Sequence, residues 1–198
     1  MRKLIIATRN RHKAKEMSAM LGAEWAVEDL ADRPELPEPD EDGATFEANA
    51  AIKAVAASFA LKGLALADDS GLEVDALGGA PGIRSARYAG PKATDKENRD
   101  RLLAALAELN PAASEPIAAR FRCAMAVAEN GIVQETFCGR VEGRIVLAEA
   151  GTGGFGYDPL FIPDGYSQTF AQLGAETKNQ LSHRARAMEE AIKWLARR

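Results

Sequence analysis

Apolar residues recur along the chain at two spacings, and each spacing predicts a different kind of element. A spacing of three and four residues, which brings side chains to one face of a helix, predicts four helices. They cover residues 11–22, 45–61, 94–109 and 182–198. Strict alternation, typical of a half-buried strand, covers residues 121–127, and apolar positions within 133–146 supply returning strands. Short apolar runs at 3–7 and 64–67 predict two further buried strands.

Turn-forming residues separate these elements. Asn130-Gly131 is a hairpin signal, and clustered Pro and Gly residues predict loops over 32–43 and 78–92. Helices alternate with strands first, and a long antiparallel ribbon follows. This order predicts an α/β fold with a mixed sheet, open to division into two lobes with a cleft between them.

Length and charge narrow the possible classes of protein. The chain has 198 residues, which at about 100–200 residues per domain predicts a single domain over residues 1–198, without a separable linker. An apolar share of 46% argues against wholesale disorder. With 25 basic and 29 acidic residues the net charge is −4, a poor match for a protein that binds long stretches of nucleic acid.

Cysteine and histidine are scarce, and this excludes two kinds of site. Two Cys and two His residues predict neither a disulfide framework nor a zinc site. The apolar run near the N-terminus covers only residues 4–7, too short for a signal peptide or a membrane span. We therefore expect a cytoplasmic protein that does not bind membranes.

The first candidate site is the polar turn that joins the first predicted strand to the first helix. It contains Thr8, Arg9, Asn10 and Lys13. Free backbone N–H groups at a helix N-terminus, with a lysine one turn further on, are suited to an anion. The alternative is an ordinary Asn or Thr cap beside a solvated lysine. The turn does not match the P-loop motif.

The second candidate site is Asp68-Asp69-Ser70-Gly71, directly after a predicted buried strand. Ligands of open α/β sheets bind at the carboxyl ends of strands. Two adjacent carboxylates repel each other and favour a cation, and oxygen ligands beside phosphate suit Mg²⁺. Glu41 in the acidic loop is a further candidate ligand. The alternative is an exposed Asp-Ser-Gly turn.

Two further clusters lie in the C-terminal third. Residues 151–156 contain four glycines, and their conformational cost favours a ligand-binding loop in which Phe155 is available to stack. The spacing fits a dinucleotide fingerprint, but a Pro-bounded strand, predicted over 157–163, follows instead of a helix. Lys178 and Ser182-His183-Arg184 form the last cluster, where Ser182 is a candidate N-cap and the two cations suit a phosphate or a base carbonyl.

In combination, these segments resemble the inosine/xanthosine triphosphate pyrophosphatase family of nucleotide house-cleaning enzymes. The resemblance extends almost from end to end and consists of an ordered set of motifs at matching spacing. The motifs are Ala7-Thr8-x-Asn10-x-x-Lys13-x-x-Glu16, Thr45-Phe46-x-x-Asn49-Ala50-x-x-Lys53-Ala54, Ala67-Asp68-Asp69-Ser70-Gly71-Leu72, residues 74–82, residues 85–90, Thr152-Gly-Gly-Phe-Gly-Tyr-Asp-Pro159, Lys178 and Ser182-His183-Arg184.

The resemblance implies a fold and an activity. The fold is an elongated, two-lobed α/β structure, with a central mixed twisted sheet flanked by helices and an active-site cleft between the lobes. The reaction is Mg²⁺-dependent hydrolysis of inosine, xanthosine and deoxyinosine triphosphates to monophosphate and pyrophosphate, which clears deaminated purines from the nucleotide pool. The family forms homodimers.

The resemblance also implies a role for each matching residue. Asp69 is the general base and a metal ligand, and Glu41 and Asp68 are the other candidate ligands. The remaining residues contact the nucleotide: Thr8, Arg9, Asn10, Arg11, His12, Lys13 and Lys53 at the phosphates, Ser70 beside them, and Phe155, Gly156, Tyr157, Asp158, Lys178, His183 and Arg184 around the sugar and base.

The chain departs from the family pattern at a few positions. Arg9 and His12 stand where relatives often carry Gly, which adds positive charge near the phosphates. Ala48 stands where a Glu is frequent, and Glu47 precedes it by one place. On a helix, these two positions face about 100° apart.

Two other functions use the same residues. A nucleotidase or phosphatase would act on monophosphates or diphosphates and release orthophosphate. A non-enzymatic nucleotide sensor would use Asp68 and Asp69 only to bind a metal, without turnover. Nucleic-acid binding is the weakest alternative, because the chain is acidic and has no basic stripe.

Overall fold

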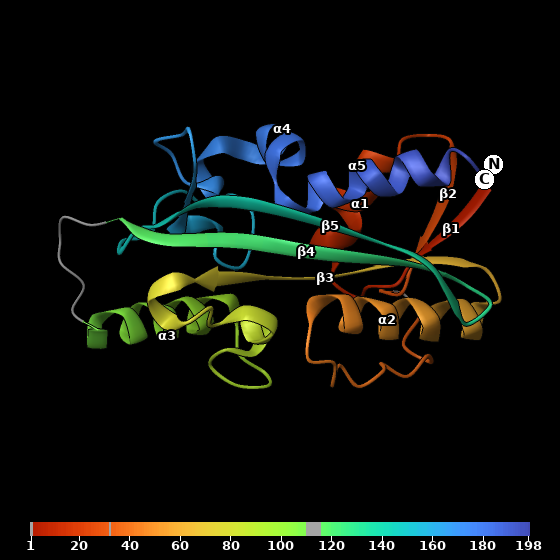
Figure 1. Cartoon of the computed structure of the whole chain (residues 1–198), viewed down its shortest axis with the longest axis horizontal. Coiled ribbons are helices and arrows are strands. Elements are labelled where there is room, and N and C mark those ends of the chain that lie inside the picture. Colours follow the sequence, from red (N-terminus) through yellow and green to blue (C-terminus); the bar gives the residue numbers. More distant parts are fainter. Residues whose placement is uncertain (1, 32, 110–115) are drawn as a thin grey trace. The chain divides into compact units, whose positions relative to one another are not determined.

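The computed structural model describes residues 2–31, 33–109 and 116–198. Six strands form one sheet in the order β2-β1-β3-β4-β5-β6, in which β1 is parallel to β2 and β3, and β5 is antiparallel to β6 (Figure 1). The strands are β1 (Arg2–Ile6), β2 (Trp25–Asp29), β3 (Leu64–Val74), β4 (Ile117–Glu129), β5 (Ile132–Ile145) and β6 (Phe161–Pro163). The predicted mixed sheet is therefore confirmed.

Within the described residues, five α-helices accompany the sheet, and the apolar spacing predicts four of them. The helices are α1 (Arg11–Leu21), α2 (Phe46–Leu61), α3 (Asp95–Leu109), α4 (Phe170–Leu181) and α5 (His183–Leu195). Short 3₁₀ turns cover Asp75–Leu77, Gly82–Arg87 and Asp158–Leu160, so the predicted loop over 78–92 is partly ordered into helical turns. None of the helices in the described ranges is long and apolar enough to cross a bilayer.

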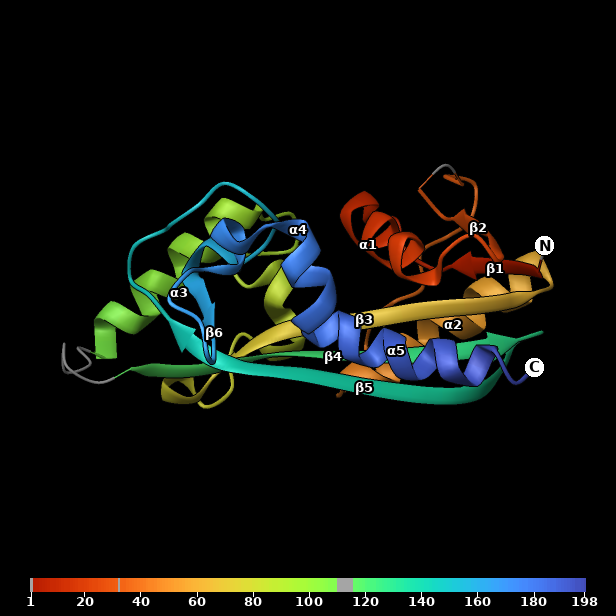
Figure 2. The same ribbon diagram turned by 90° about the horizontal axis from the view of Figure 1, so that it is seen from above.

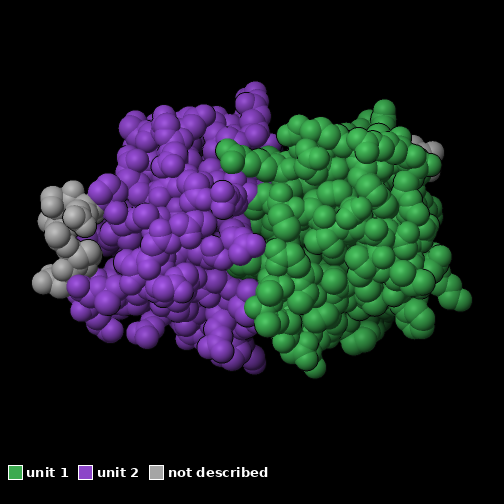
Figure 3. All heavy atoms as spheres, in the orientation of Figure 1, with its two compact units in different colours: residues 1–69, 123–139, 184–198 green, residues 70–122, 140–183 purple. Residues whose placement is uncertain are grey.

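The chain forms two compact units, which Figure 3 shows in different colours. Unit 1 comprises Met1–Asp69, Cys123–Gly139 and Arg184–Arg198, and unit 2 comprises Ser70–Arg122 and Arg140–His183. The boundaries fall within β3, β4 and β5, so each of these strands contributes residues to both units.

Within unit 1, helices cover both faces of the strands. Figure 1 shows α2 on one face and α1 with α5 on the other, and Figure 2 shows α5 lying over β4 and β5. The core on the α1 and α5 side is built from fully buried side chains such as Leu4, Met17, Leu66 and Met188. The face of α2 that packs on the strands carries small side chains. Ala50, Ala54 and Ala57 are buried there and allow the helix to approach the strands closely.

Unit 2 has its own hydrophobic core. Leu102 and Leu106 of α3 pack with Phe121 of β4, with Phe161 of β6 and with Phe170 of α4. The Phe121 and Phe161 rings meet edge to face, with centroids 4.8 Å apart. Such pairs contribute beyond their buried area, so this cluster gives the loops of unit 2 a rigid base.

The structure corrects three details of the predicted elements. The strand expected to end at Ala67 continues as β3 to Val74, so Asp68, Asp69 and Ser70 lie inside it. The returning strands within 133–146 are one strand, β5. The strand predicted to start at Tyr157 starts at Phe161, after a 3₁₀ turn. Asp32, at the start of the predicted acidic loop, lies outside the described residues.

Candidate active site

The N-terminus of α1 is organised by its cap. The Asn10 side chain accepts hydrogen bonds from the backbone N–H groups of His12 (3.0 Å) and Lys13 (3.2 Å). Thr8 Oγ1 accepts one from the N–H of Asn10 at 3.2 Å. The Asn cap is thus confirmed, but the lysine beside it is not solvated, because the Lys13 side chain is 16% exposed and pairs with Asp68. The positive end of α1 is flanked by the exposed side chains of Arg11 and His12.

Asp68 is a buried carboxylate held by two cations of unit 1. Its Oδ2 lies 3.1 Å from Lys13 Nζ and accepts hydrogen bonds from Nε (3.3 Å) and Nη2 (3.1 Å) of Arg184. Arg184 Nη1 also donates to Glu16 at 2.6 Å. Burial opposes ionisation of Asp68, but the charges of Lys13 and Arg184 outweigh it and hold the pKa of this carboxyl well below its usual range.

Asp69 occupies a different environment. Its Oδ2 accepts a hydrogen bond from Asn49 Nδ2 at 3.2 Å, and its Oδ1 lies 3.2 Å from Lys53 Nζ. Burial raises the pKa of Asp69, and the nearby charges of Lys53 and Lys13 offset this only in part. The pKa of Lys53 is also raised, because the attraction of Asp69, Asp68 and Glu41 outweighs the cost of its burial.

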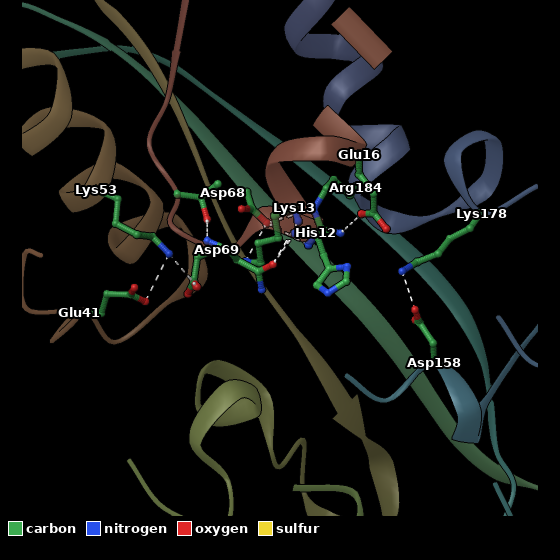
Figure 4. A network of polar contacts seen from close by, with 12 residues as sticks. His12, Lys13, Glu16, Glu41, Lys53, Asp68, Asp69, Asp158, Lys178 and Arg184 are labelled. Carbon is green, nitrogen blue, oxygen red and sulfur yellow. Dashed lines mark hydrogen bonds and ion pairs between the residues drawn. The ribbon is translucent and has the colours of Figure 1, made fainter. Parts of the chain in front are cut away.

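The acidic loop is attached to the same group of residues. Glu41 lies 3.3 Å from Lys53 Nζ (Figure 4). The N–H of Gly43 donates to Asn49 Oδ1 at 2.9 Å. A Cβ at position 43 would lie 2.6 Å from Asn49 Oδ1, so only glycine allows this approach. Asn49 therefore connects the loop to Asp69.

The two adjacent carboxylates form their described ion pairs and hydrogen bonds with different helices. Successive side chains of a strand point to opposite faces, and the contacts agree: Asp68 meets α1 and α5, whereas Asp69 meets α2. In the described ranges, no group of three or more His, Cys, Asp or Glu side chains is arranged to hold a metal ion. Asp69 and Glu41 nevertheless converge on one ammonium group, so a cation fits between them.

In unit 2, the glycine-rich loop is anchored to a buried ion pair. Asp158 Oδ2 accepts from the N–H of Phe155 at 2.9 Å and from Lys178 Nζ at 2.6 Å (Figure 4). The same ammonium lies 4.4 Å from the centroid of the Phe155 ring. A Cβ on Gly154 would lie 2.0 Å from Asp158 Oδ2, which explains the glycine next to Phe155.

Two more predicted residues of unit 2 are fixed by packing. The Tyr157 hydroxyl donates to the carbonyl of Ser85 at 2.9 Å, and burial raises the pKa of this tyrosine. The His183 ring stacks on Phe121, with centroids 4.8 Å apart and an interplanar angle of 11°. Ser70 follows Asp69 in β3 and is half-buried.

The remaining predicted positions lie toward the surface or pair elsewhere in unit 1. Arg9 Nη2 donates to the carbonyl of Leu36, and its Nε lies 3.3 Å from Glu38, so Arg9 contacts the acidic loop. Glu47 accepts a hydrogen bond from the Cys138 thiol of β5 at 3.4 Å. The contacts of Asn49 and Glu16 are not predicted from the sequence, although both residues belong to motifs that carry the family resemblance. The helical spacing of Asn49 from Lys53, and of Glu16 from Lys13, is the signal that could have indicated them.

Comparison with known sequences gives one consistent result. The profile of the Ham1 family matches residues 4–194. A dITP/XTP pyrophosphatase of Shouchella clausii is 47% identical over 190 residues, which cover 95% of this chain and 93% of that protein. A dITP/XTP pyrophosphatase of Listeria monocytogenes is 46% identical over 198 residues, with 99% and 96% covered.

Solved structures agree with the sequence comparison. A HAM1 protein from Coxiella burnetii matches with a TM-score of 0.88 and 37% identity, and both chains are fully covered. A nucleoside-triphosphatase, or dITP/XTP pyrophosphatase, from Mycobacterium abscessus matches with a TM-score of 0.74 and 39% identity, with 96% of this chain and 98% of that one covered. The expected α/β fold is confirmed.

Proposed function

The chain belongs to the Ham1 family, and on this premise we propose that it hydrolyses non-standard purine nucleoside triphosphates to monophosphate and pyrophosphate. Inosine, xanthosine and deoxyinosine triphosphates are the proposed substrates. The observation that carries the proposal is Asp69, a buried carboxylate of raised pKa that lies between Asn49 and Lys53 and close to the acidic loop.

Unit 1 supplies the groups suited to a triphosphate. The capped N-terminus of α1 presents the positive end of the helix dipole, to which Arg11 and His12 add charge. Thr8 and Asn10 fix this turn. We assign residues 8–13 and Lys53 to the phosphates, together with Ser70, the first residue of unit 2.

Mg²⁺ is the proposed cofactor, and Asp69 and Glu41 are the residues that would hold it. Both are hard oxygen donors, and Mg²⁺ is usually bound through one or two carboxylates together with substrate phosphates. When bound, the ion would neutralise phosphate charge and acidify a water molecule. The ion pairs of Asp68 with Lys13 and Arg184 favour a supporting role for Asp68 over ligation.

Asp69 is the proposed general base. It accepts a proton from the attacking water, whose oxygen bonds to the α-phosphorus while the bond to the bridging oxygen breaks and pyrophosphate leaves. A bound Mg²⁺ would acidify the attacking water, so that the Asp69 carboxylate could take up its proton. Asn49 and Lys53 hold it in place, and Lys53 also offsets the negative charge of the phosphates.

Unit 2 supplies the groups suited to a purine base. The Phe155 ring offers a stacking surface, and Tyr157, Asp158 and Lys178 fix the loop around it. A 6-keto oxygen accepts hydrogen bonds whereas the 6-amino group of adenine does not, so donors such as His183 of unit 2 and Arg184 of unit 1 would discriminate between them. Because Arg184 pairs with Asp68 and Glu16, we propose that it acts partly by holding those carboxylates.

Identification of the products tests this proposal against its rivals. The chain is incubated with deoxyinosine triphosphate and Mg²⁺ in ¹⁸O-water, the products are separated, and their masses are measured by mass spectrometry. We expect pyrophosphate and a monophosphate that carries the label. Release of orthophosphate would favour a phosphatase, label in pyrophosphate would contradict attack at the α-phosphorus, and binding without turnover would favour a sensor.

Two further proposals rest on the family. We propose that the chain acts as a homodimer, and sedimentation velocity of the purified protein tests this directly. We also propose that it acts in the cytoplasm, where the nucleotide pool lies, and fractionation of cells that express a tagged chain tests this.

A further inference from the structure

The backbone N–H and the backbone carbonyl of Gly156 both form hydrogen bonds with side chains on one face of α3. The N–H of Gly156 donates to Asp95 Oδ2 at 2.7 Å, and Nη1 of Arg99 donates to the carbonyl of Gly156 at 2.9 Å. Asp95 and Arg99 are four residues apart, so their side chains lie on the same side of the helix. We call Asp95, Arg99 and Gly156 the Gly156 clamp.

A second anchor holds the arginine of this clamp. Nε of Arg99 donates to Glu149 Oε1 at 2.9 Å, and the Arg99 side chain is only 14% exposed. The planar guanidinium thus binds a carboxylate and a backbone carbonyl together, a geometry that the single ammonium of lysine does not reproduce. Glu149 and Gly156 flank the glycine-rich loop, so Arg99 closes that loop across its two ends.

The clamp fixes the orientation of two peptide planes. The N–H of Gly156 belongs to the peptide plane shared with Phe155, and its carbonyl belongs to the plane shared with Tyr157. Gly156 itself has φ +61°, a conformation that glycine adopts at little cost but also leaves easily. With both planes held, the backbone on either side of Gly156 has little freedom left to turn.

The neighbours of Gly156 are anchored elsewhere in unit 2. Asp158 holds the N–H of Phe155, and the carbonyl of Ser85 holds the Tyr157 hydroxyl. The N–H of Asp158 also donates to the carbonyl of Phe155 at 3.2 Å, so the clamp shares the peptide plane between Phe155 and Gly156 with Asp158, and through Arg99 it holds the next plane, which contains the Gly156 carbonyl. Four glycines in residues 151–156 make this segment costly to order.

We infer that Asp95 and Arg99 are positioning residues for recognition of the nucleobase, acting through Gly156 on Phe155 and Tyr157. This inference rests on the proposed function, because it assigns the base to this loop. Neither residue is among those proposed to bind the phosphates, so loss of the clamp weakens substrate binding and leaves the chemical step nearly unchanged.

The test compares two clamp variants with two matched controls on α3. Arg99→Met keeps the apolar stem and removes both hydrogen bonds, and Arg101→Met removes an exposed arginine two residues away. Asp95→Ala removes an acid from the first turn of α3. Glu97→Ala does the same, but Glu97 bonds to Thr94 instead of the loop.

Four quantities are measured for each variant: kcat and KM for deoxyinosine triphosphate, the amide-exchange rate of residues 151–157, and the thermal midpoint. For Arg99→Met we expect KM to rise about tenfold, in line with loss of a charged hydrogen bond, with kcat within about twofold. Asp95 is exposed, so for Asp95→Ala we expect a smaller rise of about threefold. Exchange accelerates in both, Arg99→Lys recovers part of the loss, and the controls change only the thermal midpoint.

The outcomes separate this inference from the proposed function. If the wild-type chain releases pyrophosphate but both clamp variants keep its KM and its exchange rates, the inference is wrong and the function stands. A fall in kcat with unchanged KM would also overturn it, because that pattern belongs to a residue of the chemical step. If the wild-type chain releases no pyrophosphate from any triphosphate, the proposed function fails and the inference falls with it.

Discussion

Replacement of Asp68 by Asn removes the carboxylate that two buried cations share. The Asp68 side chain is fully buried, and those of Arg184 and Lys13 are 1% and 16% exposed. Asn keeps the shape and one acceptor oxygen but loses the charge. After the substitution, Glu16 remains as an ion-pair partner of Arg184, whereas the positive charge of Lys13 has less negative charge close to it.

The cost follows from the distances. At 3.1 Å from each cation, and with an effective dielectric constant of about 20, each contact is worth roughly 5 kcal/mol before desolvation is counted. Removal of one partner from a buried pair costs about 3–5 kcal/mol in measured cases. Because Asn still accepts a hydrogen bond, we expect a loss of stability at the lower end of this range, about 3 kcal/mol. For a chain of this length, that corresponds to a fall in Tm of roughly 6–12 °C.

Urea unfolding at a series of pH values measures this cost and its origin. The native-state pKa of Asp68 is lowered, so its stabilisation is present above the unfolded-state pKa of about 3.9 and disappears as pH falls through the native value. The difference between wild type and Asp68→Asn is therefore expected to be constant from pH 8 to 5 and to shrink below pH 4.

A matched control is Asp75→Asn. Asp75 pairs with Arg120 at 2.8 Å, but its side chain is 49% exposed, so we expect a cost below about 1 kcal/mol. Equal stability of wild type and Asp68→Asn at pH 7 would refute the reasoning. So would a difference that stays unchanged on acidification, because the cost would then not come from the charge.

Three other substitutions test the remaining contacts. Asn49→Asp places a like charge beside Asp69 and further raises its pKa, so the acid limb of the pH–kcat profile is expected to move to higher pH; an unmoved limb would contradict this. The Gly43→Ala substitution adds a methyl group that would overlap Asn49 Oδ1, so the acidic loop must move. Calorimetry is then expected to show weaker Mg²⁺ binding, and an unchanged affinity would show that the loop does not contribute to it. Phe155→Leu removes a stacking surface worth about 1–3 kcal/mol per base, so KM is expected to rise roughly tenfold, and an unchanged KM would exclude stacking there.

Local pattern was sufficient for most of the elements. The apolar spacing of α2 and the Asn130-Gly131 turn specify their structures because the residues that decide them are close in sequence. The pattern failed for β3, where the turn-forming residues Asp69, Ser70 and Gly71 lie inside a strand. Asp68 and Asp69 of β3 bind side chains from helices that are distant in the chain, and these contacts outweigh the local preference of the segment for a turn. It also missed α4, in which Gly174 interrupts the helix with φ +81°.

The candidate site was foreseen as a list of residues but not as a geometry. The spacing of Asn49 and Lys53 places both on one face of α2, which sequence alone allows. That this face meets Asp69 and not Asp68 depends on the direction of side chains in β3. The bond between Arg184 and Asp68 joins residues 116 positions apart, and no local pattern contains such a contact.

The most direct test of the proposed function is a comparison of kcat/KM for pyrophosphate release from deoxyinosine triphosphate with that from deoxyadenosine triphosphate, in Mg²⁺ and in chelator. Buried donors that find no acceptor on adenine predict a large preference for the inosine compound, up to about 10⁴-fold, and no release in chelator. Equal values for the two nucleotides would contradict the assignment of the base site, and release without a divalent cation would contradict the role given to Asp69 and Glu41.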